Sequence, residues 1–176
     1  MGTLRLIPVA LLASLIACSP AEKTEPVSVY PMGERVPVGH LAYTVFDRQW
    51  QNQLGAGVDA RQPQNRFYLV RVNATNNSSD ELIIPNTELV DDSGKTYPEE
   101  TNGDGVQDWL GNTRQVAGSQ TAQGYLLFDV PPKHYKLRVT GEENQHAALV
   151  DIPLSFDSDA PDIGTQFDVN KLPAKK

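Results

Sequence analysis

Short runs in which apolar and polar residues alternate recur along the chain, separated by residues typical of turns. Successive side chains of a strand point to opposite faces of a sheet, so this alternation predicts strands with one buried face. The predicted strands are residues 40–47, 67–75, 81–84, 88–90, 96–97, 125–130, 135–140 and 148–154. No stretch of the sequence has the longer periodicity of an amphipathic helix. The pattern therefore predicts an all-β protein, an immunoglobulin-like antiparallel β-sandwich of about seven strands.

The alternation also predicts which side chains form the core. The residues expected to point inward are Leu41, Tyr43, Val45, Tyr68, Val70, Val72, Ala74, Leu126, Phe128, Val130, Leu137, Val139, Val150, Ile152 and Leu154. Pro153 predicts that the last strand is an edge strand or ends there, because proline has no N–H to donate.

A leader precedes these strands. It begins with a positive charge at Arg5, continues with apolar residues 6–17 and ends in the sequence LIAC, with Cys18 last. These are the features of a secretion signal. The apolar run is 12 residues long, and a membrane-spanning helix needs roughly 20. The end of the leader resembles the lipobox of bacterial lipoproteins, so we expect residues 1–17 to be a lipoprotein signal peptide.

Cys18 is the predicted lipid attachment site. The lipobox resemblance implies that the signal peptide is removed and that this cysteine becomes the acylated first residue. Two or more acyl chains hold a protein stably at a membrane, and acylation consumes the only thiol of the chain. Ser19, in place of aspartate, implies an outer-membrane lipoprotein facing the periplasm if the host is Gram-negative. The alternative is an ordinary secretory signal cut elsewhere, with Cys18 discarded or left free.

The rest of the chain divides into three parts. Residues 18–36 contain prolines, charges and few large apolar residues, so we expect a flexible tether behind the lipid. Residues 37–156 are the predicted sandwich domain, with a polar, glycine-bearing loop at residues 48–65. Residues 157–176 are first acidic and end in lysines, which predicts a C-terminal tail that packs loosely or not at all.

Charge narrows the choice of partners. Removal of residues 1–17 takes away Arg5 as the only charge and leaves 159 residues, with 14 Lys and Arg against 22 Asp and Glu, a net charge of about −8. An acidic surface argues against nucleic acid and against charge-driven binding to anionic lipid. No cysteine remains for a disulfide, so the fold depends on an apolar core, which a domain of ~120 residues is large enough to supply.

Three stretches occur in an order that points to a known family. They are residues 72–82 (VNATNNSSDEL), 89–97 (LVDDSGKTY) and 124–131 (GYLLFDVP). In this order they resemble motifs of the telokin-like, immunoglobulin-like domain of unknown function found in bacterial lipoproteins, the DUF4352-type extracellular domain. The resemblance covers roughly residues 36–155 and implies a fold but no activity. The proline-glycine that the family places before the last motif is absent, in a loop where this chain has QVAGS at residues 115–119.

The sequence contains no recognisable catalytic or metal-binding motif. His40, His134 and His146 have no ligand spacing between them, and we expect them at surfaces or strand edges. Nucleophile elbows, phosphate-binding glycine loops and zinc-protease motifs are missing from the sequence. We therefore predict no catalytic residues, no metal and no cofactor, and do not expect an enzyme. A hydrolytic enzyme with acidic residues clustered in a cleft is the less favoured alternative.

The acidic segment at residues 99–108 offers a second function. Four of its side chains imitate the oxygen ligands in the first nine positions of a calcium loop: Glu100, Asn102, Asp104 and Asp108. The glutamate that closes such a loop is missing, because Gly111 stands in its place. The alternative is an exposed acidic loop in which Asn-Gly and Asp-Gly form turns.

Two tryptophans lie outside the alternating runs. We expect Trp50 and Trp109 to close one end of the sandwich; the alternative is that both, with Tyr97, form a surface that anchors a partner.

The sequence as a whole predicts an exported, lipid-anchored protein of the cell envelope. Its sandwich would be a non-catalytic interaction or accessory module that binds a protein partner or ligand through its loops. The alternative is a protein that binds calcium or another ligand with residues 99–108.

Overall fold

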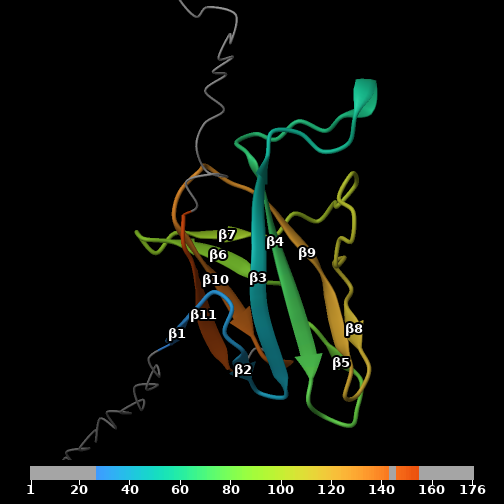
Figure 1. The fold of residues 1–176 in the computed structure, drawn as a ribbon, viewed down its shortest axis with the longest axis vertical. Coiled ribbons are helices and arrows are strands. Elements are labelled where there is room, and N and C mark those ends of the chain that lie inside the picture. Colours follow the sequence, from blue (N-terminus) through green and yellow to red (C-terminus); the bar gives the residue numbers. More distant parts are fainter. Residues whose placement is uncertain (1–26, 143–145, 155–176) are drawn as a thin grey trace, which may run out of the picture.

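Two β-sheets packed face to face form the body of the protein (Figure 1). The computed structural model describes residues 27–142 and 146–154. These residues contain eleven strands and one short 3-10 helical turn, η1 (Gly57–Asp59), and no α-helix. Within the same residues, no helix has the length and apolar character needed to cross a membrane. The prediction of an all-β sandwich is confirmed, with more strands than the seven expected.

The first sheet has five strands in the order β1-β11-β10-β6-β7. Their bounds are β1 (Ser28–Pro31), β11 (Ala147–Ile152), β10 (Tyr135–Thr140), β6 (Glu88–Asp91) and β7 (Thr96–Pro98). Neighbouring strands are antiparallel except β1 and β11, which run parallel and pair Ser28 with Ala148. The sandwich is antiparallel, as predicted, except at this one pair.

The second sheet has four strands in the order β2-β3-β4-β9. Their bounds are β2 (Val36–Val38), β3 (Leu41–Gln51), β4 (Phe67–Asn76) and β9 (Thr121–Asp129). A separate two-stranded ribbon consists of β5 (Leu82–Ile83) and β8 (Gln115–Val116). All of these neighbours are antiparallel.

The space between the two sheets is filled by the side chains that alternation assigned to the core. All of the predicted inward residues are buried except Leu154. Leu154 is exposed because β11 ends at Ile152, just before Pro153. Burial of these apolar side chains is the main stabilising contribution in a domain without a disulfide.

The sandwich begins earlier in the chain than the tether prediction allowed. The expected tether, residues 18–36, contains all of β1 and the first residue of β2. Tyr30 and Met32 pack against the core. A short edge strand needs a backbone partner and few buried side chains, so its composition resembles that of a linker. The chain up to residue 26, including Cys18, and the predicted tail at residues 157–176 lie outside the described residues.

Strand β3 continues well into the segment predicted as a long loop from residue 48. A β-bulge shifts its register against β4 between Val45 and Asp47. A bulge inserts one extra residue, which exchanges the inward and outward faces beyond it. Val45 and Trp50 are five positions apart, so unbroken alternation would place them on opposite faces of the sheet. Because of the bulge, both face the core. The alternation breaks at the bulge, which is why the sequence pattern ended this strand too early.

Candidate functional site

A second apolar cluster lies on the outer face of the β2-β3-β4-β9 sheet. It consists of Leu54, Phe67, Leu69 and Leu127, all buried. Phe67 and Leu69 alternate along β4 with Tyr68 and Val70, which face the main core. One end of this sheet is therefore buried on both faces.

Two irregular segments cover this outer cluster. They are residues 52–66, between β3 and β4, and residues 99–114, between β7 and β8; we call them the covering segments. Leu54 is held by backbone hydrogen bonds in both directions with Arg61. Val106 and Trp109 pack onto the cluster from the other segment, and Trp109 forms a β-bridge with Tyr125 of β9.

A pocket of about 430 Å³ opens between the longer covering segment, residues 99–114, and the sheet. We call it the outer pocket. Its lining residues are Gln49, Gln51, Leu69, Arg71, Gly105, Val106, Gln107, Asp108 and Tyr125. Ligand pockets typically occupy ~300–1,000 Å³, so the size suits a small molecule or a peptide fragment. The lining is mostly polar, which suits a ligand with several hydrogen-bonding groups.

Two glycines fix the position of residues 105–108, which form the loop wall of the outer pocket. A β-carbon on Gly124 would lie 2.5 Å from the carbonyl oxygen of Asp108, which accepts a 2.8 Å hydrogen bond from the Tyr125 N–H. A β-carbon on Gly105, where φ is +85°, would lie 2.8 Å from the backbone nitrogen of Gly55. Because these positions have no β-carbon, residues 99–114 pack closely against β9 at Gly124 and against residues 52–66 at Gly105.

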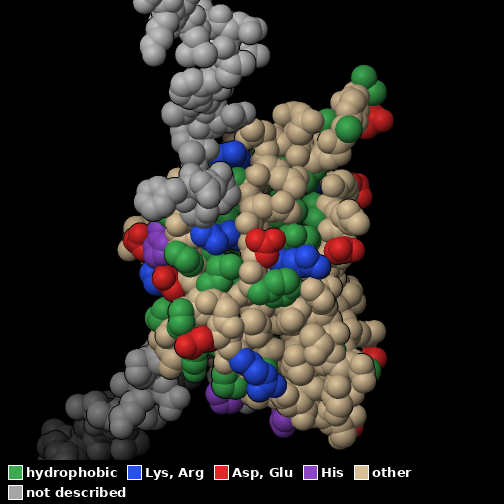
Figure 2. Space-filling view, in the orientation of Figure 1, with side chains coloured by type: hydrophobic (Ala, Val, Ile, Leu, Met, Phe, Trp, Pro, Cys, Tyr) green, Lys and Arg blue, Asp and Glu red, His purple; other side chains and the backbone are tan. Residues whose placement is uncertain are grey.

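Arg71 is the cation of the outer pocket. Its guanidinium lies over the rings of Phe46 and Tyr125, 5.3 and 5.4 Å from their centroids. Figure 2 views the molecule in the orientation of Figure 1, with charged and hydrophobic side chains close together in the middle of the visible face. Contact with two rings restricts the movement of the guanidinium and leaves its N–H groups free for hydrogen bonds.

The two tryptophans lie on opposite faces of the same sheet. Trp50 stacks on Tyr68 inside the sandwich, with ring centroids 4.1 Å apart, whereas Trp109 covers the outer cluster. Tyr97 contacts Tyr135 edge-on at 5.5 Å. The prediction that the two tryptophans together close one end of the sandwich is therefore wrong, because Trp50 packs in the main core and Trp109 on the outer cluster. The alternative, a joint recognition surface of Trp50, Trp109 and Tyr97, is wrong for the same reason.

The predicted calcium ligands do not meet at one point. The Glu100 carboxylate pairs with the Arg61 guanidinium, and Asn102 Oδ1 accepts a hydrogen bond from the Asp104 N–H at 2.8 Å. Asp108 lines the outer pocket instead. Within residues 27–142 and 146–154, no three acidic, histidine or cysteine side chains are grouped so as to hold a metal ion.

A buried ion pair holds the two ends of the longer covering segment. Arg114 Nη2 lies 2.6 Å from Glu99 Oε2, and the two side chains are only 2% and 5% exposed. Arg114 also donates to the carbonyl of Gly111 and to Asn86 Oδ1. The other oxygen of Glu99 accepts hydrogen bonds from the N–H and hydroxyl of Thr87. The segment is therefore anchored at its base to the body of the sandwich.

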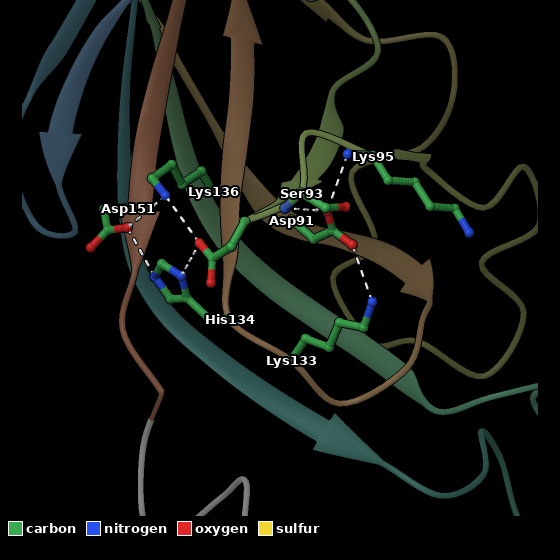
Figure 3. A network of polar contacts seen from close by, with 8 residues as sticks. Asp91, Ser93, Lys95, Lys133, His134, Lys136 and Asp151 are labelled. Atoms are coloured by element: carbon green, nitrogen blue, oxygen red, sulfur yellow. Dashed lines mark hydrogen bonds and ion pairs between the residues drawn. The ribbon is translucent and has the colours of Figure 1, made fainter.

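The motif at residues 89–97 forms a hairpin organised by one carboxylate. Asp91 accepts hydrogen bonds from the hydroxyl and N–H of Ser93 and from the N–H of Lys95, and its other oxygen faces Lys133 at 3.1 Å. Figure 3 shows these groups converging on Asp91. The Ser93 hydroxyl first, and then Lys133, lowers the pKa of Asp91 well below its usual range. The motif is thus a self-capped turn.

The histidines stand at surfaces and edges, as expected. His134 lies between two carboxylates, with its ring nitrogens 2.9 Å from Asp92 and 3.0 Å from Asp151. Figure 3 shows the contact with Asp151. The hydrogen bond from His134 is the main reason why the pKa of Asp92 is lowered. His40 Nδ1 lies 2.6 Å from Glu142 at the opposite end of the sandwich. These contacts tie loops to strands.

The fold defines a class of β-sandwich proteins that is known from other bacterial structures. The YjhA protein from Bacillus subtilis is similar over 70% of this chain and 99% of its own, with 17% identity and a TM-score of 0.53. MPT63, a secreted protein from Mycobacterium tuberculosis, is similar over 72% of this chain and 98% of its own, with 9% identity and a TM-score of 0.51.

The family profile named "Domain of unknown function (DUF4352)" matches residues 30–146, so the chain belongs to this family. A provisionally assigned lipoprotein from Bacillus subtilis, YcdA, is similar over 67% of this chain and 38% of its own, with 14% identity and a TM-score of 0.52. No curated protein matches the sequence of this chain.

Proposed function

We propose that this protein is a lipid-anchored, non-catalytic binding module of the cell envelope. The observation that carries the proposal is Cys18, the only cysteine, at the end of an apolar leader and nine residues before the described domain begins at residue 27. The likeness to a provisionally assigned lipoprotein and to a secreted protein supports export. Ser19 after the cysteine favours the outer membrane, on its periplasmic side, in a Gram-negative host.

The direction of β1 supports a defined orientation on the membrane. Ser28, where β1 begins, pairs with Ala148 at the start of β11, at the end of the sandwich that also holds His40 and Glu142. The η1 turn projects from the other end (Figure 1). Nine residues span at most about 30 Å. An anchor at Cys18 therefore keeps the first end near the bilayer and directs the covering segments away from it.

The chemistry of the outer pocket supports binding rather than catalysis. The pocket is lined by the amides of Gln49, Gln51 and Gln107, and by one carboxylate, Asp108. Amides donate and accept hydrogen bonds but do not transfer protons at neutral pH. These groups suit recognition of a ligand that leaves unchanged.

Substitution of Cys18 by serine tests the anchoring. We expect the Cys18→Ser protein to leave the membrane fraction or to remain unprocessed, and to lose incorporation of labelled fatty acid. Membrane fractionation and lipid labelling equal to those of the natural protein would contradict the proposal.

A free thiol introduced at either end tests the orientation. Acylation leaves no other thiol in the chain, so Val58→Cys in η1 and Ser79→Cys after β4 each provide a single site for a fluorophore. Val58 and Ser79 are both exposed, and Asn77, next to the second site, binds the carbonyl of His40. We expect a quencher in the lipid to reduce the fluorescence at position 79 more than at position 58. Equal quenching, or stronger quenching at position 58, would contradict the orientation.

A further inference from the structure

We propose that the outer pocket binds the carboxyl-terminal end of a short peptide, with Arg71 binding the terminal carboxylate. This assignment rests on the proposed binding function, for which it names a class of ligand. It comes from the position of one arginine, the charges around it and the hydrogen-bonding groups beside it.

Arg71 is held in place but has unused hydrogen-bonding capacity. Among the described residues, three other arginines form ion pairs: Arg61, Arg114 and Arg138. The Arg71 guanidinium has no hydrogen bond or ion pair with any described residue, and its Nε is buried without a partner. A guanidinium offers five N–H donors in a plane that matches the two oxygens of a carboxylate. The contacts with the two rings pre-organise Arg71 for such a ligand.

The carboxylate of its register partner, Asp47, does not pair with Arg71. Asp47 is its register partner on β3, yet no ion pair within 4.0 Å joins these two described side chains. Asp47 instead faces the Tyr125 hydroxyl at 3.5 Å. The cation therefore remains available to a ligand that enters the pocket.

The other lining groups favour a peptide over a polyanion. Asp108 stands on the loop wall as a second charge of opposite sign, and the whole chain is acidic. Both disfavour a ligand with several negative charges, such as a phosphate ester. A single terminal carboxylate meets Arg71 with less repulsion, and in a very short peptide the ammonium group pairs with Asp108.

The amides and apolar residues fit the remainder of such a ligand. Gln49, Gln51 and Gln107 each carry one acceptor and two donor hydrogens, which complement the N–H and C=O groups of a peptide backbone. Leu69 and Val106 provide an apolar surface for a small side chain. The pocket volume of about 430 Å³ limits the bound part to a few residues.

Calorimetric titration of the full-length protein in detergent tests the proposal. The probes are tri-alanine, its carboxyl-terminal amide and the neutral sugar maltotriose. We expect tri-alanine to bind and its amide to bind about tenfold or more weakly, because the charged hydrogen bonds to Arg71 are lost. Equal binding of the two peptides, or binding of maltotriose without tri-alanine, would overturn the assignment.

Matched arginine variants locate the site. Arg71→Gln should weaken tri-alanine binding about tenfold or more, while Arg71→Lys, which keeps the charge but not the planar fork, should lose less. Arg138→Gln removes the same charge from the other sheet, where Arg138 faces Glu88, and should bind normally. Unchanged melting temperatures exclude unfolding as the cause. Equal affinities of Arg71→Gln and Arg138→Gln would overturn the role of Arg71.

The outcome is separable from that of the anchoring experiment. If tri-alanine does not bind but fractionation still depends on Cys18, the peptide assignment fails and the proposed lipid-anchored module stands. If tri-alanine binds and fractionation does not depend on Cys18, the pocket is assigned and the anchor is not.

Discussion

Trp109 packs directly on the backbone of Gly103: a β-carbon added to Gly103 would lie 1.9 Å from the indole ring. This contact lets the indole pack closely on the covering segment that contains it and against the outer cluster. Any side chain at position 103 must displace the tryptophan or the loop, and with it the wall of the outer pocket.

Gly103→Ala should therefore destabilise the domain. Overpacking of a filled site typically costs ~1–3 kcal/mol, and we expect a lower urea midpoint together with a changed tryptophan emission spectrum. Thr101→Ala, at an exposed position in the same segment, is the control and should be nearly neutral. A Gly103→Ala protein with the stability and spectrum of the natural chain would show that this contact is not maintained in solution.

Glu99 and Glu100 are neighbours in sequence but should respond very differently to the same substitution. Glu99→Gln breaks a buried ion pair and leaves Arg114 without its counter-ion, which typically costs ~3–5 kcal/mol. Glu100→Gln breaks a pair whose side chains are 32% and 27% exposed, worth at most ~1 kcal/mol. Chemical denaturation of both variants measures the difference. Equal losses would mean that Arg114 is reached by solvent.

Asp91 should make the domain sensitive to acid. Hydrogen bonds, first of all from Ser93, hold its pKa below the ordinary value in the folded protein. Because the folded pKa is the lower one, the stabilisation is complete above the unfolded pKa of about 3.9 and is lost as the pH falls below it. The melting temperature should therefore fall steeply below about pH 4. Asp91→Asn should be less stable at pH 7 and show a shallower fall; Asp59→Asn, at the exposed η1 turn, is the control.

Trp50 and Val58 give a comparison between a core side chain and a projecting one. Trp50 is buried and stacked on Tyr68, so Trp50→Ala should cost ~3–5 kcal/mol. Val58 is fully exposed, and Val58→Ala should change the free energy of unfolding by less than ~0.5 kcal/mol. Thermal and urea unfolding measure both. A destabilised Val58→Ala protein would show that the η1 turn packs against another part of the chain.

Sequence patterning predicted most of the sandwich because alternation reports burial of one face. It failed where that rule does not hold. The bulge at Val45 and Asp47 reverses the faces of β3, and β1 depends mainly on backbone pairing with β11. Neither leaves a pattern of alternating side chains.

The outer pocket was missed for a related reason. Two uninterrupted apolar runs, residues 67–70 and 125–128, signal strands that are buried on both faces. They indicate that something covers the outer face, and the isolated Leu54 and Trp109 are what covers it. Arg71 carries no such signal, because its role depends on rings from β3 and β9 that only the fold brings to it.

The parallel pairing of β1 with β11 also determines how the domain responds to mechanical force. A pull on residue 27 along the axis of β1 loads the hydrogen bonds to β11 together, in shear, instead of opening them one after another. Met32 and Gly33 extend the attachment with backbone bonds to Asp151 and, in the other sheet, to Val45. A domain held at Cys18 and bound at its far end would transmit tension between membrane and ligand through both sheets, without peeling its first strand away.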